Sequence, residues 1–275
     1  MCMYRISPTS LIREYRTFSK DFWLSYKTLE KILPEIQFAD MKMKLLKSKK
    51  IMLDSIPGLD IEQFKIEREL LEKEWTEKNE EAKQTGTLVH EQIHNLFCTD
   101  LHYVKTNFGI DTDKYQVQRT EEFLKANKGI FNEFKLEIPI AEDFLLVGIA
   151  DCIIRDGNHI SIIDFKSDEK IPFRSIYEVG KKKSKRMKYP LVNLEDASGI
   201  HYQIQLSLYA WMIQQLDPNL IIDNLVIVQV ENLKKKKEFP VEYLKEDVEK
   251  LLKWHVKSVR LKTEMDKCNS LNFDK

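Results

Sequence analysis

Two apolar segments joined by a tight-turn signal are the feature that most restricts how this 275-residue chain can fold. FLLVGIADCII (144–154) and HISIIDF (159–165) are rich in β-branched residues, which favours strands. Asp156-Gly157-Asn158 lies between them and is typical of a hairpin turn. We therefore expect an antiparallel pair of buried strands, against which the other elements must pack.

The second strand of this pair carries two charged residues among its isoleucines. Because side chains alternate along a strand, Ile162, Asp164 and Lys166 share one face. Asp151 lies 157 − 151 = 6 residues before Gly157, and Asp164 lies 164 − 157 = 7 residues after it, so the two carboxylates should be neighbours across the hairpin.

Two neighbouring carboxylates repel each other, and a divalent cation such as Mg²⁺ or Mn²⁺, which prefers hard oxygen ligands, would compensate them. Lys166 would then help to orient or deprotonate a water, or stabilise charge developing on a phosphate. The same pattern also fits a surface hairpin in which Asp164 and Lys166 form a plain salt bridge.

The remaining segments predict an α/β protein. The order is helix, three-stranded meander, helix and strand, followed by a closing helix. In sequence these are a helical region over 60–97 with a break at Gly86, strands at 134–140, 144–154 and 159–165, a helix over 201–216, a strand at 224–230 and a helix over 244–264. We expect a mixed central sheet, with residues 1–84 as an N-terminal helical extension packed on a core of residues 85–275, so that the chain forms one compact domain.

Charge, cysteine content and the lack of targeting segments indicate where the protein acts and which partners it can attract. Basic and acidic residues number 44 each, so the net charge predicts no global attraction to a polyanion. The basic runs at 42–50, 181–188 and 234–237 are compatible with local phosphate contacts or with ordinary solvated loops. Four dispersed cysteines without a CxxC pair argue against a zinc site and for a reducing compartment. Without a signal-peptide core or a membrane-length apolar run, a cytoplasmic protein is expected.

Five short motifs occur in an order that resembles the PD-(D/E)XK nuclease superfamily, specifically its RecB-like and phage-type exonuclease branch. The motifs are GTLVH (86–90), LEIP (136–139), VGIAD (147–151), IIDFKS (162–167) and QLSLY (205–209). The resemblance covers over half of the chain. It implies a restriction-endonuclease-like core and hydrolysis of phosphodiester bonds in DNA replication, recombination or repair.

The resemblance also implies the metal-binding and catalytic groups. Asp151 and Asp164 would be the core metal ligands, joined by the main-chain carbonyl of Phe165 and by His90, which reaches in from its helix. Lys166 would be the catalytic lysine.

A second set of implied roles concerns positions around that centre. Glu137 would be a further catalytic acid that binds a second metal ion or a metal-bound water. Gln205 and Tyr209 lie four residues apart on one helix face and would contact the nucleic acid or orient the catalytic groups. The basic loop would guide the DNA strand through phosphate contacts by Lys181, Lys182, Lys183, Lys185 and Arg186.

Some relatives hold an iron–sulfur cluster with three cysteines near the C-terminus, but here only Cys268 lies in that region, so no such cluster is expected. A GxxxxGK[ST] loop is absent from the sequence, so no use of ATP is expected. We expect a Mg²⁺- or Mn²⁺-dependent exonuclease, phage-encoded or bacterial, that acts on DNA without sequence specificity. The alternatives are a non-catalytic nucleic-acid-binding or assembly module on the same fold and a site-specific restriction-type endonuclease. Homo-oligomer formation and association with a replication or recombination complex stay open.

Overall fold

A computed structural model describes residues 4–16, 19–97, 123–175, 185–231 and 235–272, without the side chains of 89–97, 231, 235–236 and 266–272. The chain divides into two compact units. Unit 1 contains residues 1–16, 89–175 and 186–275, and unit 2 contains residues 17–88 and 176–185. The expected boundary between residues 84 and 85 stays a prediction.

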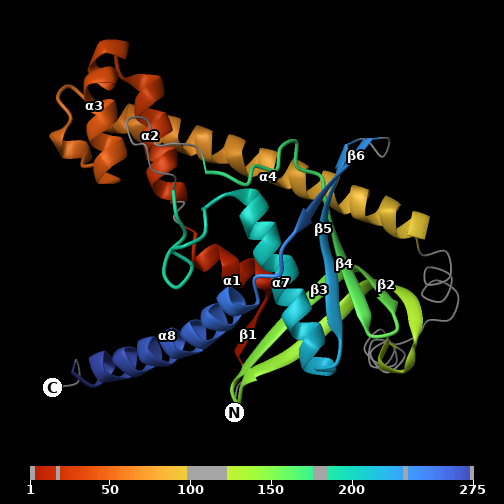
Figure 1. The fold of residues 1–275 in the computed structure, drawn as a ribbon. Helices are drawn as coiled ribbons and strands as arrows, with labels where there is room; N and C mark the ends of the chain where they lie inside the picture. The colour runs from red at the N-terminus through yellow and green to blue at the C-terminus, as the bar shows by residue number, and fades with distance from the viewer. Residues whose placement is uncertain (1–3, 17–18, 98–122, 176–184, 232–234, 273–275) are drawn as a thin grey trace, which may run out of the picture. The chain divides into compact units, whose positions relative to one another are not determined.

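Unit 1 is built on the predicted hairpin (Figure 1). β3 (Phe144–Asp156) and β4 (His159–Lys166) pair antiparallel around a turn in which Gly157 has a φ of 63°. This left-handed backbone conformation costs glycine little and explains the residue at this position. β2 (Lys128–Ala141) pairs antiparallel along the length of β3 and completes the predicted meander.

Three further strands extend the hairpin into a six-stranded mixed sheet. β5 (Ile221–Glu231) runs parallel to β4, and β6 (Lys235–Val241) runs antiparallel to β5. β1 (Tyr4–Ile6) runs parallel to the start of β3. The strand order β1-β3-β4-β5-β6, with β2 also on β3, confirms the predicted α/β fold with a mixed central sheet.

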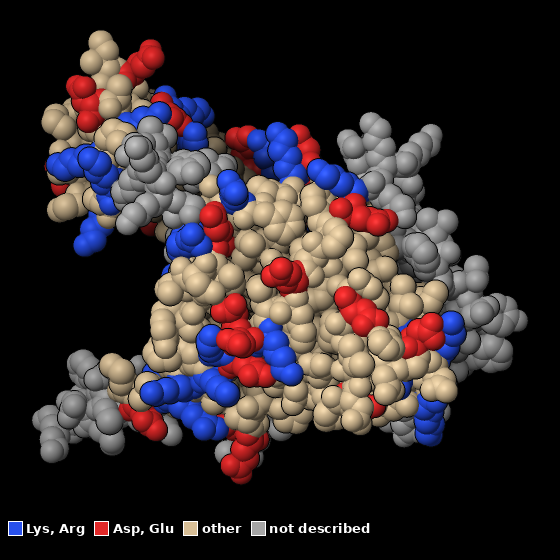
Figure 2. All heavy atoms as spheres, in the orientation of Figure 1, with Lys and Arg blue, Asp and Glu red and all other residues tan. Residues whose placement is uncertain are grey.

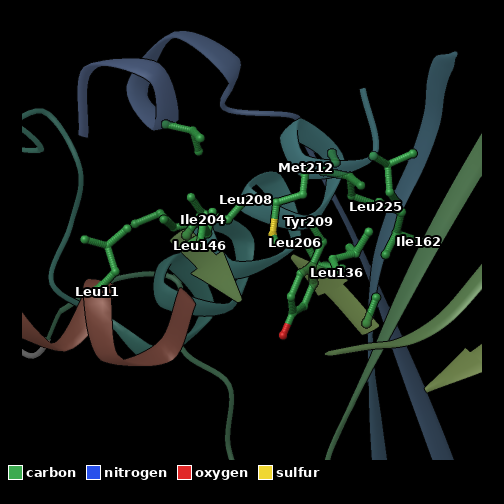
Figure 3. Packing of buried hydrophobic residues seen from close by; sticks show 14 of the residues in the cluster. Leu11, Leu136, Leu146, Ile162, Ile204, Leu206, Leu208, Tyr209, Met212 and Leu225 are labelled. Carbon is green, nitrogen blue, oxygen red and sulfur yellow. The ribbon is translucent and has the colours of Figure 1, made fainter. Parts of the chain in front are cut away.

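A buried helix connects the two parallel strands of this sheet. α7 (Ser198–Leu216) carries the chain from β4 to β5, as a parallel pairing requires. It is apolar on nearly all sides, so it is buried, and it contacts β2 to β5 together with α1 (Pro8–Glu14) and α8 (Lys245–Asn272). Figure 3 shows α7 side chains packed among residues from several strands, with Leu206, Tyr209 and Met212 of α7 near Leu136, Ile162 and Leu225.

Unit 2 is helical and has its own apolar cluster, as its sequence suggests. It contains α2 (Lys20–Ile32), α3 (Glu35–Ser48), the short 3-10 helix η1 (Leu53–Ser55) and the first part of α4 (Ile61–Phe97). The buried cluster includes Phe22, Leu29, Phe38, Leu45 and Phe64.

The expected helix break at Gly86 is wrong, because α4 continues through this residue to Phe97. A glycine inside a helix costs only about 1 kcal/mol relative to alanine, which a long helix tolerates.

Strands β1 and β6 were not expected from the sequence. β1 has only 3 residues, too few for a visible alternation. β6 reads KKKEFPV, whose lysines and Pro240 suggest a loop, yet β6 is an edge strand, where lysine and proline are common. Among the described helices, none has both the length and the apolar character that a membrane span needs.

Gly148 of β3 allows α7 to approach the sheet closely, and this contact can be tested. A Cβ at this position would lie 2.7 Å from Cε1 of Tyr209 and 3.2 Å from the ring of Pro8. We expect Gly148→Ala to lower the free energy of unfolding in urea by about 1–3 kcal/mol through overpacking. In a Tyr209→Leu background the same substitution should cost less, and an equal cost in both backgrounds would show that Tyr209 is not the obstacle.

Candidate active site

The hairpin strands separate at the two carboxylates. Pairing between β3 and β4 runs from Asp156–His159 to Cys152–Ile163, and Asp151 and Asp164 hold the next two positions. There the backbone N–H of Phe165 donates to Oδ2 of Asp151 at 2.8 Å. A side-chain carboxylate therefore accepts the hydrogen bond at the point where the ladder between the two strands stops.

Asp164 is buried; its Oδ1 accepts a hydrogen bond, and its Oδ2 makes an ion pair but no hydrogen bond of regular geometry with the described residues. Its side chain is 1% exposed, and its Oδ2 lies 2.6 Å from Nζ of Lys166. Nε2 of Gln205 donates to Oδ1 at 3.3 Å and also to the hydroxyl of Tyr209 at 3.1 Å. The Asp164–Lys166 contact is not a surface salt bridge, because the lysine side chain is itself only 15% exposed.

Asp151 has a strongly altered acidity. Burial, and then the charge of Asp164, raise its pKa to about 8, although Lys166 and the N–H of Phe165 act in the opposite direction. Without a metal ion, the Asp151 carboxyl therefore carries a proton at neutral pH. A cation that binds between the two acids would displace this proton.

Lys166 stays protonated in this setting. Burial lowers its pKa, but the charges of Asp164 and Asp151 outweigh burial, so the pKa lies above the ordinary value. An ammonium group that keeps its proton is suited to stabilise negative charge on a phosphate. Of the two roles considered for Lys166, stabilisation of phosphate charge is therefore favoured over deprotonation of a water.

Glu133 of β2 is an acidic neighbour of Asp151 that the sequence motifs did not indicate. It has a φ of 47°, a left-handed conformation that is rare for a non-glycine residue inside a strand. It lies opposite Asp151, because the flanking β2–β3 pairs are Asn132–Cys152 and Phe134–Ala150. Its charge contributes to the raised pKa of Asp151.

The regular alternation of residues that β3 contributes to the core is interrupted at Asp151. Leu146 and Ala150 contribute to the main core before this residue, and Ile153 contributes after it, so the two-residue alternation is interrupted. The irregular step coincides with Glu133 on one neighbouring strand and with the end of β4 pairing on the other. Asp151 thus lies where the sheet departs from regular geometry, as is common next to functional sites.

The structure does not bring Glu137 to the two aspartates. Glu137 pairs with Val147 on β3, four residues from Asp151, which corresponds to roughly 13 Å along the strand. Its carboxylate lies 3.1 Å from Nζ of Lys135. The role of Glu137 as a second-metal ligand stays a prediction.

Gln205 and Tyr209 lie where they can orient the acids. Tyr209 is only 4% exposed, and burial, followed by the nearby Asp164 charge, raises its pKa. Gln205 joins this hydroxyl to the Asp164 carboxylate. Of the two predicted roles, the geometry favours orientation of the catalytic groups over contact with nucleic acid.

The structure describes the remaining predicted site residues only in part. His90 belongs to α4, but its side chain lies outside the described residues, as do Lys181, Lys182 and Lys183. Lys185 is half-buried, whereas Arg186 is exposed and its Nη1 donates to the carbonyl of Asn193 at 2.5 Å. Their contacts with DNA stay predictions.

The residues present fit part of a metal site. Within the described part of the chain, no three His, Cys, Asp or Glu side chains are close enough to hold a metal ion together. Asp151 and Asp164 nevertheless supply two hard oxygen donors. The raised pKa of Asp151 reflects its burial first and then a repulsion from Asp164, which a cation would relieve. A complete site requires a further ligand such as His90.

Tyr202 and Asp168 lie beside the lysine and were not predicted as catalytic or metal-binding residues. Nζ of Lys166 lies over the ring of Tyr202, 4.8 Å from its centroid, and the Tyr202 hydroxyl donates to Oδ2 of Asp168 at 2.8 Å. Tyr202 precedes Gln205 by three residues. This spacing puts both residues on one helix face and could have indicated that Tyr202 lies near the site.

Gly148 was also not predicted to have a role. It is visible in the sequence as a glycine within an apolar strand, which is a sign that another element approaches the backbone closely.

The raised pKa of Asp151 predicts a specific pH dependence of stability in EDTA. The unfolded carboxyl loses its proton near about pH 3.9, whereas the folded one keeps it until about pH 8. Its stabilising contribution is therefore complete below the unfolded pKa and is lost as the pH rises through the folded pKa. We expect the free energy of unfolding of the wild type to fall across this range relative to that of Asp151→Asn. Parallel curves in urea denaturation would contradict the assignment.

Comparison with known proteins identifies the family. A family model described as the PD-(D/E)XK nuclease superfamily matches residues 67–272. No curated protein matches the chain. A crystal structure of the protein SSO0001 is similar at 14% identity over 94% of this chain and 75% of that one, and its TM-score of 0.36 supports no conclusion. PD-(D/E)XK nucleases are hydrolases that act on DNA and generally use divalent metal ions. The family match covers most of the chain, which therefore belongs to the PD-(D/E)XK nuclease superfamily.

Proposed function

We propose that this protein is a Mg²⁺- or Mn²⁺-dependent deoxyribonuclease of the RecB-like and phage-type branch that degrades DNA from an end. The observation that carries this proposal is the buried Asp164 carboxylate, held by Lys166 and Gln205 beside a second carboxylate, Asp151. A buried cluster of charges of this kind adds little to the stability of the fold, because burial of charge costs free energy. It is suited to chemistry on a phosphate.

The metal ion would be held by Asp151 and Asp164, with the carbonyl of Phe165 and the imidazole of His90 as further ligands. A divalent cation supplies Lewis acidity here, because it acidifies water and neutralises charge on a phosphate and on a departing oxygen. The preference of carboxylate and carbonyl oxygens for Mg²⁺ and Mn²⁺ supports the choice of metal.

The chain's own groups have separate tasks. The Lys166 ammonium faces the negative charge that develops on the phosphate, and its raised pKa keeps it charged at the pH of the reaction. Gln205, linked to Tyr209, donates a hydrogen bond to one oxygen of Asp164, and Lys166 forms an ion pair with the other. The Asp164 carboxylate is thereby oriented before any ligand binds.

Binding of DNA would depend on local contacts. On the face drawn in Figure 2, basic and acidic side chains are interspersed, in line with the net charge of zero. The basic loop at 181–188 is therefore proposed as a local phosphate-binding segment that does not depend on sequence. Preference for a DNA end rests on the motif resemblance, and the cytoplasm of a bacterial or phage-infected cell is the proposed location.

The proposal is tested with end-labelled single- and double-stranded DNA incubated with Mg²⁺, Mn²⁺ or EDTA. We expect metal-dependent products that shorten progressively from one end. Lys166→Ala should lower the cleavage rate by about 100-fold or more, because it removes charge stabilisation in a water-poor site. Lys170→Ala removes an exposed lysine four residues away and is the matched control, with a rate close to that of the wild type.

Three results would change the conclusion. Full metal-dependent cleavage by Lys166→Ala would show that the proposed site does not carry out the cleavage. Binding of DNA without cleavage under every metal would favour the non-catalytic module. Discrete internal products would favour a site-specific endonuclease.

A further inference from the structure

Two neighbours of the Lys166 ammonium are the Asp164 carboxylate and the aromatic ring of Tyr202. The Lys166 ammonium contacts the Asp164 carboxylate at 2.6 Å and lies 4.8 Å from the centroid of the Tyr202 ring. From this arrangement we infer that Tyr202, anchored by Asp168, is a positioning residue that holds the Lys166 ammonium in its reactive place. The inference rests on the proposed nuclease function and goes beyond it, because no motif of the chain includes Tyr202.

One face of α7 holds both charged groups of the DxK segment. Tyr202 and Gln205 are three residues apart, so their side chains leave the helix on the same side. Gln205 donates to Asp164, and Tyr202 provides its ring to Lys166. The buried helix α7 therefore sets the positions of the Asp164 carboxylate and the Lys166 ammonium together.

The Tyr202 ring is fixed at its far end. Its hydroxyl donates to Oδ2 of Asp168 at 2.8 Å. The segment that carries Asp168 is itself tied to β5, because Nε2 of Gln229 donates to the carbonyls of Asp168 and Glu169 at 2.6 and 2.9 Å. A ring held at both ends cannot turn away from the lysine, so Asp168 acts through Tyr202.

The physical effect is restriction of a flexible ammonium. A lysine side chain has several rotatable bonds, and one ion pair alone leaves its ammonium free to pivot about the Asp164 carboxylate. An aromatic face attracts the ammonium, and the attraction is strongest where water is excluded, as around this lysine. Misplacement by about 1 Å can cost roughly 100-fold in rate, so a contact of this kind matters for catalysis.

Positioning of Lys166 and stacking on a DNA base predict different kinetic effects when Tyr202 is removed. If Tyr202 stacked on a DNA base, its loss would weaken DNA binding and leave the chemistry at saturating DNA unchanged. If it positions Lys166, its loss lowers the single-turnover rate and leaves the DNA Kd, measured in EDTA by fluorescence anisotropy, nearly unchanged.

The kinetic test compares three variants of the full chain. Tyr202→Leu removes the ring and should lower the saturated single-turnover rate by about 30- to 100-fold. Tyr202→Phe keeps the ring but loses the Asp168 anchor, so about 2- to 5-fold is expected, and this partial rescue is the signature of the ring. Trp211→Leu is the matched control, because Trp211 is a partly buried aromatic on the same helix that lies outside the site.

Two kinetic results would overturn the inference. A Tyr202→Leu rate within twofold of the wild type would show that the ring is not needed. A Tyr202→Phe rate as low as that of Tyr202→Leu would show that the hydroxyl carries the effect, which contradicts positioning of the lysine by the aromatic face.

An NMR measurement without metal or DNA separates this inference from the proposed function. The Lys166 ε-methylene protons should be shifted upfield by the Tyr202 ring current in the wild type and in Tyr202→Phe. The shift should disappear in Tyr202→Leu and persist in Trp211→Leu. If the wild type cleaves no DNA, the proposed function fails, yet loss of the shift only in Tyr202→Leu still supports positioning. Persistence of the shift in Tyr202→Leu overturns it.

Discussion

The structure depends on the placement of two carboxylates inside an apolar hairpin. Asp151 and Asp164 lie at adjacent positions of β3 and β4, where pairing of the strands stops; Asp164 is buried and Asp151 is half-buried. Burial, and then repulsion from Asp164, raise the pKa of Asp151, whereas attraction to the two acids raises the pKa of Lys166 against the effect of its own burial. Isoleucines behind the acids hold the strands in place, so a site that is electrostatically unfavourable by itself is maintained by the surrounding core.

Helix α7 connects this electrostatic site to the stability of the fold. Its apolar side chains fill the core between the strands and the helices α1 and α8. From the same helix, Gln205 reaches Asp164 and Tyr202 reaches Lys166. The close approach of α7 is possible because Gly148 leaves room for the Tyr209 ring. Packing and chemistry therefore depend on one interface between α7 and the sheet, and a change at this interface affects both.

The sequence predicted the parts of the fold that depend on local patterns. The turn at Gly157 and the alternation along the second strand were sufficient to predict the hairpin and the neighbouring positions of Asp151 and Asp164. Edge strand β6 and the continuous helix α4 were missed, because lysines, a proline and a glycine locally favour loops and breaks that tertiary context overrides. The contacts of Glu133 and Tyr202 depend on register and helix placement, which motif spacing does not specify.

We propose that Asp151 and Asp164 form a divalent-metal site in which a bound ion replaces a proton. Calorimetric titration of the protein with Mn²⁺ at pH 7, in buffers with different ionisation enthalpies, tests this claim directly. We expect saturable binding with release of about one proton per ion, and no such binding in Asp151→Asn or Asp164→Asn. Absence of saturable binding, or binding by the wild type without proton release, would contradict it.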